Sequence, residues 1–492
     1  MKLGKVLVIA SLLAVVAPMR TVAQEASLDT LLNFVRDLSN SRFEGRQAGS
    51  DEYMYAADYV ISALQRFGVK PYKGEWAQYF ETEYNKIENC TFNSYVNPQN
   101  RQVYVLGRDF CCAGMTGRGY ADAQVVFCGY GIDAPAFNEY EKIDAKGKIV
   151  MVLSGTPNFL PSTITDKYLQ LRDKARAAQA HGACALVVVN MSPTCQPYEV
   201  QGSVYSGDLP HLATFPIIQP TRQCGEILLK DELMSLQDAV QKIQQTQEPQ
   251  SFHLRKKFEI DVNARYHPAA LTANVIGIYE GSDSKMSDEY VVVGANLDGV
   301  GMQGTTCLFP GADDNASGVA ALLEMARMLQ QSPDQPSRSV LFVLFSAGEQ
   351  QHLGSQIFVS NFTPLKGIEA FVNVSSVGCG DSIAVLGNKR YPKLWGTARK
   401  VDTTYCTNDV VTGYKTMPKG DAVAFDHVGI PSINITCFKG HRHAHVPSDI
   451  VENIDRRFIV KATQLLFETV LDLSFGEYQG RSNASRRVRF DK

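Results

Sequence analysis

Polar side chains follow several apolar, strand-like runs in the C-terminal half of the chain, and each group comes after a different run. These residues are Asn296, Asp298, Asp313, Asp314, Asn315, Glu349 (after Gly348), Gln350, Ser375, His441, His443 and His445. In open parallel sheets, ligands bind outside the carboxyl ends of the strands, so these side chains are expected at one edge. Carboxylate and imidazole groups are ligands for Zn²⁺ and similar divalent ions. The pattern therefore predicts a metal site at this edge.

The elements that must position these residues alternate between strand and helix after residue 267. Apolar strand-like runs occur at residues 289–298, 339–349, 367–376, 382–387 and 432–437, and amphipathic helical patterns at 318–331 and 456–473. Apolar strands alternating with helices are typical of a sheet covered on both faces. We therefore predict an α/β fold whose central sheet is mainly parallel, with helices on both faces.

The first half of the chain divides differently. Residues 27–66 have helical spacing, and Gly68 is a natural stop for the helix predicted over 51–67. Residues 80–110 are polar and strand-like, and a β-rich module with a helix at 168–181 ends near Tyr266. We expect a signal peptide at 1–23, parts of the main domain at 24–92 and 267–475, an inserted domain at 93–266 and a basic tail at 476–492, expected to be disordered.

Composition narrows the classes of function. The 492 residues are 45% hydrophobic and 20% charged, as expected of a globular protein, and the net charge of −3 favours neither a nucleic-acid nor an anionic-membrane partner. Lys2 and Lys5 precede an apolar run, and Thr21 and Ala23 suit cleavage before Gln24. We therefore expect a secreted or periplasmic protein without a membrane anchor. Its eleven cysteines permit disulfides there, but the spacing assigns no pairs.

Five segments resemble the zinc aminopeptidases of metallo-peptidase family 28: YVVVGANLDGVG, PGADDNASGVAALLEMARML, FVLFSAGEQQHLGSQIFV, FVNVSSVG and HAHVPSDIVENID. SNSRFEGRQAGSDEYMYAADYVISALQRFGVKP is similar to the N-terminal helices of that family. VVFCGYGIDAP, AKGKIVMVLSG and KARAAQAHGACALVVVN resemble an inserted protease-associated domain. The resemblance implies a zinc-exopeptidase (phosphorylase/hydrolase-like) fold in which the insert covers or shapes the site.

The resemblance also implies residue roles. Asp314 matches the aspartate that bridges two metals, and Glu349 and His445 match the remaining ligands of the second metal. Asn296 stands where the family has a histidine ligand of the first metal, and Ser375 where it has an aspartate. The chain is thus expected to hold at most one zinc ion.

The general-base glutamate of the family matches Gly348, and Asp298 matches the residue that orients the lost histidine. An alignment shifted by one residue would make Glu349 the base and Gln350 the failed ligand. The ungapped alignment is preferred because Leu353, Gly354 and Ser355 then stay in register.

Other residues could substitute for the lost groups. Asp313, Asp421 and Asp449 are candidates to replace the base, and Cys307 or Cys379 could supply a thiolate ligand.

The resemblance implies an aminopeptidase-type hydrolase that removes N-terminal residues from peptides. Loss of one metal site and of the general base predicts that this activity is weak or lost. Two alternatives stay open: a non-catalytic protein that binds peptides on the peptidase scaffold, and a single-zinc enzyme similar to glutaminyl cyclases.

Overall fold

The computed structural model describes residues 25–191, 210–286, 288–405, 416–440, 443–476 and 478–480. The expected signal peptide and most of the expected basic tail lie outside this part of the chain, as do His441 and Arg442. None of the described helices combines the length and apolar character needed to cross a membrane.

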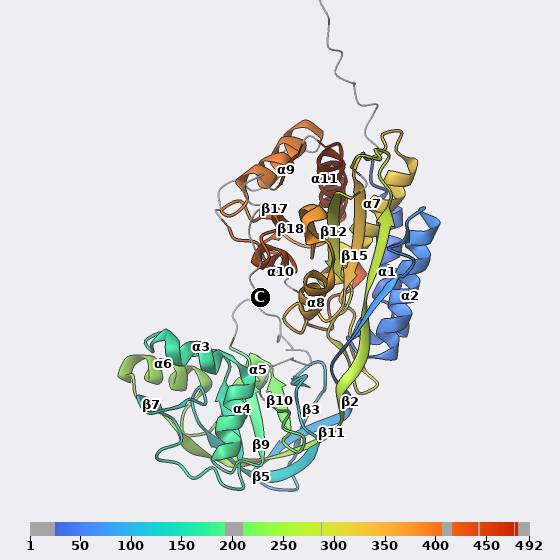
Figure 1. The fold of residues 1–492 in the computed structure, drawn as a ribbon. Helices are drawn as coiled ribbons and strands as arrows, with labels where there is room; N and C mark the ends of the chain where they lie inside the picture. The colour runs from blue at the N-terminus through green and yellow to red at the C-terminus, as the bar shows by residue number, and fades with distance from the viewer. Residues whose placement is uncertain are drawn as a thin grey trace, which may run out of the picture.

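The main domain is a sheet with helices on both faces (Figure 1). Its strands are β1 (Lys70–Pro71), β12 (Tyr290–Asn296), β13 (Gly301–Gln303), β14 (Cys307–Phe309), β15 (Ser339–Phe345), β16 (Ile368–Val374), β17 (Ser382–Leu386) and β18 (Ser432–Phe438). Its α-helices are α1 (Leu28–Leu38), α2 (Asp51–Arg66), α7 (Gly318–Gln331), α8 (Leu353–Asn361), α9 (Pro392–Tyr405), α10 (Ala422–His427) and α11 (Arg456–Ser474). Short helical turns occupy η1 (Ser41–Arg46), η2 (Ala312–Ser317), η3 (Leu365–Gly367) and η4 (Val451–Asn453).

The sheet order confirms the predicted topology. Strands run in the order β17-β18-β16-β12-β15, and the pairs β18–β16, β16–β12 and β12–β15 are parallel. The flanking strand β17 is antiparallel to β18. The polar residues that follow β12, β15, β16 and β18 therefore share one edge of the sheet.

Alternation along the strands explains why both faces are covered. Val291 and Val293 of β12 belong to a core with α1, α2, α7, α9 and α11, whereas Val292 belongs to a core with α8 and α10. Successive side chains of a strand point to opposite faces, so a strand buried on both sides reads as a continuous apolar run.

The inserted domain forms a second core of its own. Its strands are β3 (Gln102–Tyr104), β4 (Phe110–Cys112), β5 (Gly119–Phe127), β6 (Asp133–Ala134), β7 (Phe137–Asn138), β8 (Ile149–Leu153), β9 (Ala185–Val189) and β10 (Ile217–Pro220). Its helices are α3 (Ser162–Leu169), α4 (Leu171–Ala180), α5 (Arg222–Leu228) and α6 (Leu236–Thr246). The single helix predicted over 168–181 is in fact two, because Gln170 has an extended backbone (ψ 124°) between α3 and α4.

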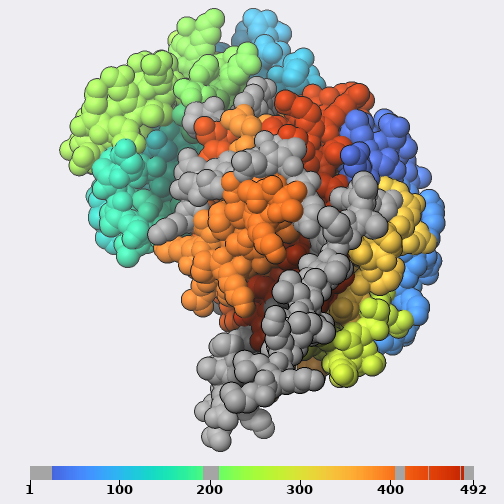
Figure 2. Space-filling model, turned by 90° about the horizontal axis from the view of Figure 1, so that it is seen from above, coloured from blue at the N-terminus to red at the C-terminus, as the bar shows by residue number. Residues whose placement is uncertain are grey.

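Two long strands join the domains. β2 (Ala77–Tyr95) and β11 (Phe252–Tyr279) pair antiparallel along most of their length. β11 pairs with β15 at its main-domain end and with β5 at its other end. The boundaries expected at residues 92/93 and 266/267 thus fall inside continuous strands. In the space-filling view, the inserted domain (green) projects from one side of the main domain (Figure 2).

Candidate metal centre

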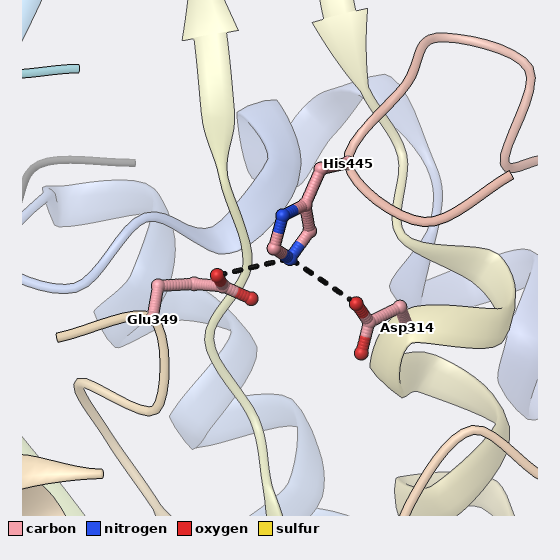
Figure 3. A group of neighbouring side chains, drawn as sticks. All are labelled: Asp314, Glu349 and His445. Carbon is pink, nitrogen blue, oxygen red and sulfur yellow. Dashed lines mark ion pairs between the residues drawn. The ribbon is translucent and has the colours of Figure 1, made fainter. Parts of the chain in front are cut away.

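Three side chains converge at the carboxyl edge of the sheet. Nε2 of His445 lies 3.2 Å from Oδ2 of Asp314 and 3.0 Å from Oε2 of Glu349 (Figure 3). The three possible ligand atoms all lie within 4.8 Å of one another. In the described part of the chain, this is the one group of three or more histidine, cysteine, aspartate or glutamate residues close enough to share a metal ion. The structure therefore brings together the three ligands expected from the sequence.

The geometry and chemistry of this trio suit a zinc ion. Ligands about 2.1 Å from a tetrahedral zinc are about 3.4 Å apart, close to the spacings around Nε2 of His445. Carboxylate oxygen and imidazole nitrogen are both zinc ligands, and three protein ligands leave a fourth position open. The side chains are 21%, 14% and 19% exposed for Asp314, Glu349 and His445, so an ion there would be reached from solvent.

Each ligand is positioned by a different element. Asp314 lies in η2, the turn before α7, and Glu349 lies in the loop between β15 and α8. His445 lies in the loop that follows β18, where its backbone is left-handed (φ 57°). Such a conformation is uncommon for residues other than glycine and is found at sites that the surrounding structure fixes.

The turn that carries Asp314 is held by another buried carboxylate. Asp449 accepts hydrogen bonds from the backbone amides of Asp313 (2.8 Å) and Asp314 (3.0 Å). The Ser376 hydroxyl donates to Oδ1 of Asp314 at 3.1 Å, which leaves Oδ2 toward His445. Asp313 in turn accepts from the amide of Gly378. Asp313 and Asp449 therefore act as supports of the turn.

The carboxylates strongly affect proton binding here. Burial alone would lower the pKa of His445, but the charges of Glu349 and Asp314 outweigh it and raise that pKa well above its ordinary value. Burial, followed by repulsion from Glu349, raises the pKa of Asp298 to about 7. Burial and the neighbouring Asp313 raise the pKa of Asp449 to about 7. Excess negative charge in a poorly solvated place is an environment that favours a cation.

The positions expected for a first metal carry neutral side chains that bond to their neighbours. Oδ1 of Asn296 accepts from Nδ2 of Asn315 at 2.8 Å. Ser375 and Asn434 are linked by hydrogen bonds of 3.2 Å through the serine hydroxyl. Oδ1 of Asn315 also accepts from the amide of Ser376, the residue after Ser375, so the two hydrogen-bonded pairs adjoin each other.

The structure distinguishes the two alignments of the loop after β15. The carboxylate of Glu349 points toward His445, whereas Gln350 is 1% exposed and donates through Nε2 to the carbonyl of Glu83 in β2. Gln350 also accepts from the hydroxyl of Thr82. This geometry favours the ungapped alignment, in which Gly348 occupies the base position.

The carboxylate of Asp298 is fully buried and accepts hydrogen bonds from the backbone amides of Gly348 (2.8 Å) and Glu349 (3.2 Å). Its role in this structure is therefore to fix the loop that carries Glu349. A β-carbon added at Gly348 would lie 2.8 Å from that of Asn296 and 3.0 Å from Oδ1 of Asp298. The neighbouring residues therefore leave no room for a side chain at position 348.

Two residues near the site were not anticipated from the sequence. The imidazole of His352 lies with Nδ1 3.5 Å from Oδ1 of the buried Asp421. Burial alone would lower the pKa of His352, but the charge of Asp421 outweighs it and raises the pKa to about 9. Asp421, a candidate for the general base, is therefore paired with the protonated imidazole of His352. No spacing rule links residues 352 and 421, which come from different loops.

Arg46 is the second unanticipated residue, and it is fully buried. Its guanidinium donates to the carbonyls of Leu38 (2.6 Å), Leu297 (2.9 Å), Pro310 (2.8 Å) and Gly311 (3.0 Å). Burial lowers the pKa of Arg46 to about 10, a value at which it remains charged at neutral pH. The side chain ties the N-terminal helices to the loops that precede the metal ligands.

The two cysteines proposed as substitute ligands are not part of the trio. Cys307 lies in β14 with its sulfur 3.6 Å from that of Cys111 in the inserted domain. Cys379 lies beside Cys437, a residue of β18.

Fold and site define an α/β protein with three potential metal ligands, Asp314, Glu349 and His445, at the carboxyl edge of its sheet. Residues 274–470 match the model of peptidase family M28, and residues 118–228 match the PA domain. The chain thus contains a region that matches peptidase family M28 and, before it in the sequence, a region that matches the PA domain.

Curated relatives include aminopeptidase YwaD of Bacillus subtilis, which is 25% identical over 382 residues covering 74% of this chain and 71% of the relative. An aminopeptidase of Pseudomonas aeruginosa is 26% identical over 72% of this chain, but the match spans only 58% of that relative.

Solved structures agree on the fold. A zinc aminopeptidase from Bacillus subtilis superposes with a TM-score of 0.63 at 20% identity, over 94% of this chain and 97% of that one. An aminopeptidase from Aneurinibacillus sp. strain AM-1 gives 0.62 at 18% identity, over 93% and 97%.

Proposed function

We propose that this chain is an exported, aminopeptidase-type protein that binds one zinc ion through Asp314, Glu349 and His445 and receives the N-terminal end of a peptide. Its hydrolytic activity is weak or lost. The observation that carries the proposal is the contrast within one site: three ligands converge, while the base position is glycine and the first-metal positions are neutral. Export rests on residues 1–23, which lie outside the described part of the chain.

The chemistry follows from what remains. A zinc ion held by three protein ligands polarises a carbonyl and lowers the pKa of its water to about 7. This chain offers no carboxylate at position 348 to take a proton, and a missing general base costs about 10²- to 10⁴-fold in rate. Asp313 and Asp449 are engaged with backbone amides, so neither replaces the base.

A non-catalytic peptide-binding protein is the second candidate, favoured by the packing of Asn296 and Asp298 around Gly348. The cyclase-like alternative would need a carboxylate base beside the zinc, and position 348 provides none.

Metal content tests the centre directly. The purified full chain should contain about one zinc ion per molecule, measured by inductively coupled plasma mass spectrometry after dialysis. His445→Ala should lower zinc affinity at least about 100-fold, because only two of the three ligands, Asp314 and Glu349, would remain. His443→Ala is the matched control, since His443 lies in the same loop but bonds to Ser448. Equal zinc binding by both variants would disprove the assigned centre.

The zinc-loaded protein then separates the two candidates. Slow release of an N-terminal residue from a short peptide, lost in His445→Ala and kept in His443→Ala, identifies a peptidase. Peptide binding without any release identifies the non-catalytic protein.

A further inference from the structure

A cavity of about 410 Å³ lies beside the candidate metal centre, between β17, β18 and residues 416–420. It is large enough for a whole amino-acid side chain. Ser375 lines it, and the next residue, Ser376, donates to Asp314 of the trio. A peptide with its reacting carbonyl at the trio would therefore have the neighbouring side chain beside this cavity.

The charge of the cavity wall is one-sided. Among the residues that the structure describes, its lining includes Lys419 and Lys439 and no aspartate or glutamate. In the described part of the chain, neither ammonium lies within ion-pair distance of a carboxylate. Cations that have no carboxylate partner at the wall of a concave site attract an anionic ligand, more strongly at low salt.

The remaining wall matches a side chain with an apolar stem and a polar end. Val385, Leu386 and Phe438 supply apolar surface. The hydroxyl of Thr436 and the amide of Asn434, which are 8% and 4% exposed as residues, supply polar groups. A glutamate side chain has both parts: methylene groups for the apolar surface and a carboxylate for the lysines.

We propose that this cavity receives the side chain of the peptide's N-terminal residue and prefers an acidic one, glutamate or aspartate. The inference rests on the proposed function, because it assumes that a peptide N-terminus lies at the trio. It names the class of peptide that the site takes, whether or not the peptide is cleaved.

Binding of matched peptides to the zinc-loaded full chain tests the preference. The probes are Glu-Ala-Ala, Met-Ala-Ala and Lys-Ala-Ala, each extended by a C-terminal lysine that carries fluorescein, and the measurement is fluorescence anisotropy at low salt. Glutamate and methionine are similar in length, so their comparison isolates charge. The glutamyl peptide should bind at least about tenfold more tightly than the methionyl peptide, and the lysyl peptide most weakly.

Charge removal then assigns the preference to the cavity. Lys419→Met with Lys439→Met should reduce the ratio of glutamyl to methionyl affinity to within about twofold. Lys400→Met, on the exposed surface of α9, should leave it unchanged. Equal affinities in the wild type, a lysyl preference, no binding of any probe, or a ratio unchanged in the double variant would each overturn the proposal.

The zinc content of the same samples keeps the two proposals separate. Zinc at about one ion per chain without a glutamyl preference overturns only the cavity assignment. A glutamyl preference without zinc supports the cavity and overturns the metal centre.

Discussion

Asn296 and Ser375 replace ionisable ligands with neutral groups that already have partners. Asn296 is bonded to Asn315, and Ser375 to Asn434. A cluster of carboxylates without a cation would be costly to bury, whereas neutral hydrogen-bonded groups are not. This half of the site is therefore stable without a second ion, and the other half retains the charges that favour one.

Restoring the ligand types should restore the second metal. Asn296→His with Ser375→Asp places an imidazole and a carboxylate after neighbouring parallel strands, beside Asp314. We expect about two zinc ions per chain in this double variant and about one in the wild type, measured by mass spectrometry of dialysed protein. Asn296→Ala with Ser375→Ala is the control and should keep one. One ion or fewer in the restored variant would show that the two positions do not face Asp314.

Adding Gly348→Glu to that double variant should lower the free energy of unfolding. The new β-carbon would be under 3 Å from that of residue 296. Overpacking of this kind typically destabilises by about 1–3 kcal/mol. The triple variant should thus bind two ions but unfold at lower urea concentration than the double variant.

Among the elements, η1 connects the N-terminal helices to the site through Arg46. Its guanidinium donates to four backbone carbonyls, of which those of Leu297, Pro310 and Gly311 are distant in sequence. Arg46→Met would keep much of the volume but leave these acceptors without the donor. A buried unsatisfied polar group costs about 1–3 kcal/mol, so we expect a loss of at least about 3 kcal/mol in the free energy of unfolding, measured with urea.

Arg66→Met is the matched control for that measurement, because Arg66 is an exposed arginine at the end of α2. Exposed substitutions usually change stability by less than about 0.5 kcal/mol. A similar, small effect of both substitutions would contradict the role assigned to Arg46.

Helices with a strong periodic pattern of apolar residues were predictable from the sequence. Breaks between helices and contacts between distant loops were not. The helix predicted over 318–331 is α7, and the closing helix differs from α11 by one residue, because their apolar positions face a sheet. The break at Gln170 was missed, since no glycine or proline marks it. The contacts of Arg46 and His352 depend on loops far apart in sequence, which periodicity does not describe.

For the molecule as a whole, the two domains are joined by the long strands β2 and β11, and a side-chain contact adds a second connection. Cys111 of β4 and Cys307 of β14 lie with their sulfur atoms 3.6 Å apart, in a small buried cluster with Val300 and Phe309. Cys111 belongs to the inserted domain and Cys307 to a hairpin of the main domain. The two sulfur atoms are this close only when the two domains have the relative placement seen in the structure.

Oxidation should convert this contact into a link between the domains. During prolonged incubation with glutathione disulfide, in which local opening exposes these buried thiols, one thiol takes a glutathionyl group and releases one glutathione, and attack by the other thiol releases the second glutathione and forms the Cys111–Cys307 bond. A closed loop of this length stabilises by up to about 5 kcal/mol in the chain-entropy model. We therefore expect a cross-linked peptide in non-reducing mass spectrometry and a higher thermal midpoint. Cys307→Ser should abolish both and Cys184→Ser neither, whereas failure of Cys111 and Cys307 to cross-link would contradict this placement of the domains.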